Sequence, residues 1–253
     1  MARNWVLLRG LIRESRHWEG FDRAMQATFS QDRVEALDLP GNGSLCTMRS
    51  PDSIEEMVAA LRQQLSAQGM TPPFHVVALS LGAMTAISWL SDYPGEVAAA
   101  TLINTSVARF SPAWRRLRYQ NYGRVARALL TSQRQTREEI ILSITSNRLD
   151  PAARQELARR WAGYARERPV SRANALRQLW AAARFHAPET LPDGVPVQLL
   201  NGGGDRLVSP SCSRDLASGW GVPLEIHPQA GHDLTLDDSD WAIERIRRWA
   251  ATL

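Results

Sequence analysis

Six short runs rich in Val, Leu and Ala recur along this 253-residue chain. None of them alternates strictly between apolar and polar residues, so each run predicts a strand that is covered on both faces. Helical patterns separate the runs, and this alternation favours an α/β fold with a doubly wound, mostly parallel sheet of about six strands. The predicted strands cover residues 4–8, 34–39, 74–79, 97–103, 195–200 and 222–227.

The alternation stops between about residues 107 and 188, where the pattern is helical throughout and no strand-like run occurs. The charge changes in the same place. Residues 109–184 hold 17 Arg and 5 acidic residues, net +12, whereas the rest of the chain holds 13 Arg and 21 acidic residues, net −8. Pattern and charge together predict an inserted helical subdomain over 107–188, within a core formed by residues 1–106 and 189–253.

Ser80 ends the third predicted strand, and a predicted helix begins at Leu81. Ligands of doubly wound sheets bind at the carboxyl ends of the strands, so Ser80 lies where chemistry would occur. Ala78 and Gly82 flank it in the pentapeptide ALSLG, and a nucleophile on a sharp strand-to-helix turn requires small residues there. By itself the pentapeptide also fits an ordinary small residue at a strand end.

A serine hydroxyl is a weak nucleophile unless a base takes its proton. His232 follows the last predicted strand in a glycine-led loop, and Asp205 follows the fifth strand and three glycines. A carboxylate beside the histidine would fix its tautomer and stabilise its charged form. Ser80, Asp205 and His232 therefore form a candidate triad, whereas the other histidines are interpreted as structural or surface residues: His17, His75, His186 and His227.

With these residues the sequence resembles the α/β-hydrolase family, serine esterase type, over nearly all its length. The resemblance rests on ALSLG at 78–82, the G-x-x-D-x-x-V segment at 202–208, Gly231-His232 and LDLPGNG at 37–43. It implies an α/β-hydrolase fold whose inserted segment forms a helical cap over the serine. The chemistry implied is a two-step acyl transfer that requires no cofactor and no metal.

The same resemblance assigns the oxyanion hole to the backbone N–H groups of Leu11 and Leu81. Arg9 stands before Gly10 where the family usually has histidine. It either hydrogen-bonds the loop or attracts an anionic substrate. Trp18 is expected to form a wall of the substrate pocket.

A single helix is expected at the start of the cap, with one apolar stripe. The stripe consists of Trp114, Leu117, Tyr122, Val125 and Leu129. Arg118 falls inside this stripe, and the opposite face holds Arg116, Arg124 and Arg127. Either the stripe faces the core while Arg118 extends its charged end to solvent, or Arg118 binds an acid group of the substrate and the outer arginines meet an acidic partner.

The resulting prediction is a serine hydrolase that cleaves small-molecule carboxylic esters through an acyl-enzyme. The cap also loosely resembles esterases that cleave the methyl ester of pimeloyl carried on acyl carrier protein, and an acidic carrier protein would suit a basic cap. A non-hydrolytic lyase with the same triad is a further alternative. A catalytically silent binding module is the last.

Several partners and locations are not expected from this sequence. The apolar run before Arg9 is too short for a signal peptide, and no segment approaches the length of a membrane span. Cys46 and Cys212 form no paired or metal-spaced motif. The arginines are not interleaved with aromatic residues in a nucleic-acid-binding motif. We therefore expect a cytoplasmic protein with no metal, membrane or nucleic-acid partner.

Overall fold

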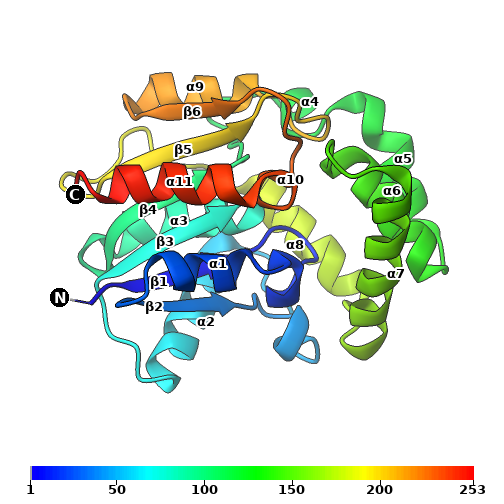
Figure 1. Cartoon of the computed structure of the whole chain (residues 1–253), viewed down its shortest axis with the longest axis horizontal. Coiled ribbons are helices and arrows are strands. Elements are labelled where there is room, and N and C mark those ends of the chain that lie inside the picture. The colour runs from blue at the N-terminus through cyan, green and yellow to red at the C-terminus, as the bar shows by residue number, and fades with distance from the viewer. Residues whose placement is uncertain (1) are drawn as a thin grey trace.

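A computed structural model describes residues 2–253 and contains a six-stranded sheet in which every neighbouring pair is parallel (Figure 1). The strand order is β2-β1-β3-β4-β5-β6. The fold class and the number of strands predicted from the sequence are confirmed. The strands are β1 (Asn4–Leu8), β2 (Arg33–Leu37), β3 (Phe74–Leu79), β4 (Val97–Ile103), β5 (Val197–Gly202) and β6 (Leu224–His227).

Helices cover both faces of the sheet (Figure 1). Because side chains alternate between the faces of a strand, each buried strand contributes to two separate hydrophobic clusters. In β1, Val6 and Leu8 belong to the cluster under α2, α3 and α9, whereas Trp5 and Leu7 belong to the cluster under α1 and α11. The bounds are α1 (Phe21–Thr28), α2 (Ile54–Ala67), α3 (Leu81–Asp92), α9 (Ser211–Trp220), α10 (Leu234–Asp237) and α11 (Ser239–Ala250).

All regular structure between β4 and β5 is helical in the part of the chain that the structure describes. Helices α6 and α7 pack on each other and bury a small cluster of their own, centred on Trp161. Asp150 and Ser171 cap α7 and α8 by accepting from the main-chain N–H groups of Ala153 and Asn174. These insertion helices are α4 (Ala113–Arg116), α5 (Tyr122–Leu130), α6 (Arg134–Thr145), α7 (Pro151–Glu167) and α8 (Arg172–Arg184).

The prediction of a single helix at the start of the insertion is wrong. Leu117 is extended, with φ −136° and ψ 109°, and this residue separates α4 from a short 3₁₀ turn and α5. The main-chain N–H of Arg118 donates to the carbonyl of Leu207, 2.9 Å away, instead of continuing a helix. Trp114 and Tyr122 are 63% and 49% exposed, so the predicted stripe does not face the core.

No helix among residues 2–253 combines the length and the apolar content needed to cross a membrane.

Candidate active site

Ser80 lies on a strained turn between the buried strand β3 and helix α3. Its φ is 56° and its ψ is −111°, a backbone conformation that a residue other than glycine rarely adopts. The main chain is held on both sides of this turn. Its N–H donates to the carbonyl of Ile103 at 2.9 Å, and its carbonyl accepts from the Thr105 hydroxyl at 3.1 Å. The Ser80 side chain therefore projects from the carboxyl end of the sheet.

Close backbone contacts explain the small residues around this serine. A Cβ at Gly82 would lie 2.5 Å from the Leu8 carbonyl oxygen and 2.7 Å from that of Arg9. A Cβ at Gly10 would lie 3.2 Å from the Cβ of Ser80. Glycine at 82 is thus required because α3 begins directly against the end of β1.

Ser80, His232 and Asp205 are joined in one chain of hydrogen bonds. The Ser80 hydroxyl lies 3.1 Å from His232 Nε2, and His232 Nδ1 lies 2.7 Å from Asp205 Oδ2. His232 is 5% exposed and Asp205 is 1% exposed. Burial disfavours the charged imidazole, but the carboxylate of Asp205 more than offsets this and raises the pKa of His232 above its ordinary value. The structure brings the three sequence-predicted residues together.

The second oxygen of Asp205 is fixed by the main chain of its own loop. Oδ1 accepts from the N–H groups of Leu207 at 2.8 Å and Val208 at 2.9 Å. Arg118 also reaches this loop, since its guanidinium donates to the Asp205 carbonyl oxygen at 3.1 Å. Arg118 thus contacts the loop that carries the acid, and its contact with an acid group of the substrate stays a prediction.

Two residues that the sequence reasoning missed hold the acid and histidine loops in place. Asn104, at φ 47°, accepts from the Gly202 N–H at 2.8 Å and donates to the Gly231 carbonyl at 2.8 Å. Asp237 accepts from the Gly231 N–H at 2.6 Å and from the Asn147 N–H at 2.9 Å. Asparagine at a strand end is a signal for the positive φ, because asparagine tolerates it better than most residues.

Arg9 forms a buried ion pair beside the histidine. Its two terminal nitrogens donate to the carboxylate oxygens of Asp233 at 3.0 and 2.6 Å, and Arg9 and Asp233 are 3% and 4% exposed. Burial opposes ionisation of Asp233, but Arg9 outweighs it and lowers the pKa of that carboxyl. Of the two roles considered for Arg9, this geometry favours the one in which Arg9 hydrogen-bonds the neighbouring loop, because its positive charge is already paired with Asp233.

Trp18 lies under the same guanidinium. Its indole is 1% exposed, and it stacks on Phe21 with ring centroids 5.1 Å apart. The guanidinium carbon of Arg9 lies 4.9 Å from the centroid of the Trp18 ring. Trp18 therefore lies in the core. The resemblance had implied that it forms a wall of the substrate pocket, and this expectation is wrong.

The two amides expected to form the oxyanion hole lie on neighbouring elements. Leu81 is the first residue of α3, and Leu11 follows β1 in a turn closed by a hydrogen bond from the Arg13 N–H to the Gly10 carbonyl at 3.2 Å. The Leu81 N–H has no partner within α3, because the first N–H groups of a helix are unpaired, and within residues 2–253 the turn contacts include no bond from the N–H of Leu11 or Leu81. Both groups are thus free to donate to a ligand.

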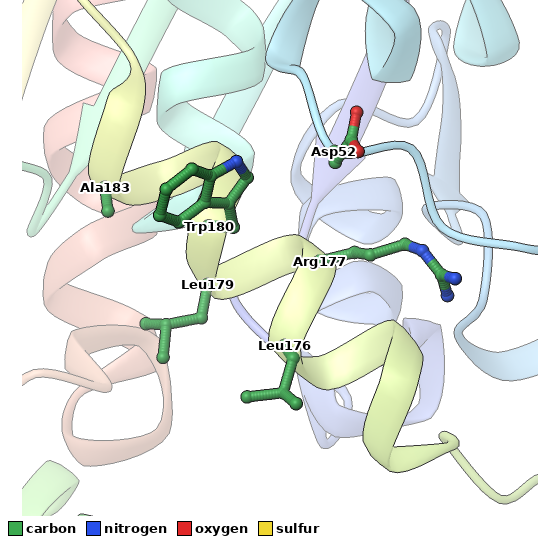
Figure 2. Close-up of a pocket in the computed structure, with 6 residues that line it drawn as sticks. All are labelled: Asp52, Leu176, Arg177, Leu179, Trp180 and Ala183. Carbon is green, nitrogen blue, oxygen red and sulfur yellow. The ribbon is translucent and has the colours of Figure 1, made fainter.

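A surface hollow lies outside this site. A surface hollow of about 560 Å³ covers the outer side of α8, where Leu176, Leu179 and Trp180 line it (Figure 2). None of the three hydrogen-bonded residues lines this hollow. Among the described residues no group of three or more His, Cys, Asp or Glu side chains has the arrangement of a metal site.

The model of the alpha/beta hydrolase family matches residues 5–245. A search of curated protein sequences finds no match. The fold is similar to several solved structures. A mutant of the meta-cleavage product hydrolase CumD is 18% identical with a TM-score of 0.80, and the alignment covers 100% of this chain and 92% of that one.

Two further structures show the same similarity of fold. The enol-lactonase from Burkholderia xenovorans LB400 has 18% identity, a TM-score of 0.74, and coverage of 99% of this chain and 92% of its own. An alpha/beta hydrolase fold protein from Chitinophaga pinensis has 14% identity, a TM-score of 0.75, and coverage of 100% and 90%. With the family match over most of its length, this chain belongs to the alpha/beta hydrolase family.

Proposed function

We propose that this chain is a serine hydrolase that cleaves carboxylic esters through an acyl-enzyme. The observation that carries the proposal is the hydrogen-bonded sequence Ser80–His232–Asp205, built on a strained turn at the carboxyl end of the sheet. A serine in ordinary structural use requires neither the positive φ nor a buried imidazole within hydrogen-bond distance.

Each residue has a defined role in the proposed reaction. His232 Nε2 accepts the Ser80 proton as Oγ attacks the ester carbonyl carbon, and the Leu11 and Leu81 amides donate to the oxyanion that forms. Collapse of this intermediate breaks the bond to the alcohol, which leaves with the proton from His232. Water then attacks the acyl carbon and gives a proton to His232. The bond to Ser80 Oγ breaks, the acid leaves, and His232 returns the proton to Oγ, which restores the Ser80 hydroxyl.

Labelling with a fluorophosphonate tests the nucleophile. The probe is expected to modify Ser80, identified by peptide mass spectrometry, and to leave the Ser80→Ala variant unmodified. A panel of p-nitrophenyl esters of increasing acyl length then tests the reaction class. Absence of label would favour a silent binding module, whereas labelling without hydrolysis of any ester would favour a lyase or another chemistry on the same residues.

The pH dependence of kcat/KM reports on His232. Only its neutral form accepts the Ser80 proton, and its pKa is raised, so kcat/KM is expected to fall with acidification around a midpoint above 6.5. The measurement is the initial rate on one ester across buffers of constant ionic strength. His186→Gln, an exposed histidine of the insertion, is expected to leave the profile unchanged. A midpoint below 6.5 would contradict the geometry of the pair with Asp205.

The charge of the insertion favours an acidic protein as the carrier of the ester. Arg124 and Arg127 of α5 are exposed, within a segment of net charge +12. Opposite charges accelerate association and make it dependent on salt. An ester on an acyl carrier protein is therefore expected to be cleaved with a higher kcat/KM than the same free ester at low ionic strength, and this advantage is expected to shrink with added salt.

A further inference from the structure

Helix α8 of the insertion buries two amide side chains and exposes its largest apolar side chains. Leu176 and Trp180 are 58% and 55% exposed and lie on the outer side of the helix (Figure 2). Asn174 and Gln178, in contrast, are 5% and 0% exposed. Buried amides destabilise a protein unless their hydrogen bonds are made, so the inner face of α8 must be explained by its partners.

Gln178 contacts the loop that follows β1 and the loop that follows β2. Its Oε1 accepts from the main-chain N–H of Ile12 at 3.0 Å. Its Nε2 donates to Asn42 Oδ1 at 2.8 Å and to the Ser50 hydroxyl at 3.0 Å. Asn42 in turn donates to the Arg13 carbonyl at 3.0 Å. One side chain of α8 thus holds the segment 10–13 directly at Ile12 and through Asn42 at Arg13.

The segment 10–13 needs such support, because its backbone is strained. The Arg13 N–H donates to the Gly10 carbonyl, and Ile12, the third residue of this turn, has φ 58°. Turns of this kind, with positive φ at the third position, favour glycine or asparagine there. A β-branched residue at positive φ is an outlier that persists only where neighbouring structure holds it.

We propose that Gln178 is a positioning residue for the oxyanion hole. Its Oε1 accepts a hydrogen bond from the Ile12 N–H. This bond fixes the turn 10–13, whose second residue is Leu11. The inference rests on the proposed function, since Leu11 acts as a donor only if Ser80 attacks a carbonyl. Gln178 acts on the reaction through the backbone of this turn. It therefore affects the position of the Leu11 N–H and does not contact the substrate.

Substitution of Gln178 by Met keeps the length of the side chain and removes all three hydrogen bonds. One oxyanion donor contributes roughly 10²–10³ in kcat, so a displaced donor is expected to lower kcat about 10- to 100-fold and to change KM by less than about threefold. A trifluoromethyl ketone, which forms an oxyanion with the serine, is expected to bind more weakly by about the factor lost in kcat/KM.

Two further variants separate positioning from a general loss of packing. Burial favours the neutral carboxyl in Gln178→Glu, which keeps an oxygen acceptor for the Ile12 N–H and a hydroxyl donor for Asn42 Oδ1, so its kcat is expected to lie within about threefold of the parent protein. Asn174→Leu removes the neighbouring buried amide, which bonds the Ser50 N–H and the Met48 carbonyl but not the turn 10–13. Its kcat is expected to change by less than about threefold.

Fluorophosphonate labelling of the parent protein distinguishes failure of the inference from failure of the proposed function. If Ser80 is labelled and Gln178→Met keeps kcat within about threefold, the inference is overturned while the proposed function stands. Equal losses of kcat in Gln178→Met and Asn174→Leu would also overturn it, because they would indicate a purely structural effect. If Ser80 is not labelled, the proposed function fails and the inference fails with it.

Discussion

Asp205→Asn is expected to lower kcat for ester hydrolysis by about 10⁴, with the fold retained. Oδ1 of Asp205 accepts from the N–H groups of Leu207 and Val208, so the amide oxygen of asparagine would occupy that place. The amide nitrogen would then face His232 Nδ1. Because a donor cannot accept from an N–H, His232 would carry its proton on Nε2 and could not accept the proton of Ser80.

The measurement is kcat on the ester hydrolysed fastest by the parent protein, together with thermal unfolding of both proteins. Asp215→Asn is the matched control, because Asp215 is a partly exposed aspartate whose partners are Arg115 and Ser111 and which does not contact His232. Its kcat is expected to stay unchanged. Retention of more than a tenth of the parent kcat by Asp205→Asn would show that the carboxylate does not control the tautomer of His232.

The sheet and the positions of the three hydrogen-bonded residues could be predicted because their signals are local. A strand covered on both faces leaves a continuous apolar run, and each of the three residues lies in the turn or loop that follows a predicted strand. The register of parallel strands then brings their carboxyl ends to one edge, as the pairing of Leu8 with Ala78 and of Ile103 with Leu200 shows. Spacing in the sequence therefore places Ser80, Asp205 and His232 at one edge of the sheet, whereas Asn104 and Asp237 fix the loops that carry the last two.

The rest of the site depends on contacts between residues far apart in the sequence. Arg118 leaves its expected helix because its N–H meets the carbonyl of Leu207, 89 positions later in the chain. Arg9 likewise pairs with Asp233, and Gln178 accepts from Ile12. A helical wheel also assigns polar residues to solvent, so it gives no signal for a helix such as α8 whose amides face inward.

Arg9→Met is expected to lower the free energy of unfolding by about 3–5 kcal/mol at neutral pH. Asp233 would then keep a buried charge with no partner, whereas Arg9 now bonds both of its carboxylate oxygens. Urea unfolding followed by circular dichroism measures the loss. The double variant Arg9→Met/Asp233→Leu replaces the pair by apolar side chains and is expected to recover most of the stability, because apolar replacements of buried ion pairs are often neutral.

The pH dependence of this loss distinguishes charge from packing. Arg9 lowers the pKa of Asp233 despite its burial, so the pair stabilises the parent protein above the ordinary value of 3.8 and this contribution is lost as the pH falls through the lowered pKa. In Arg9→Met the buried carboxyl prefers its neutral form, and the deficit is expected to shrink between pH 7 and pH 4. A deficit that stays constant over this range would instead assign the loss to the packing of Arg9 on Trp18.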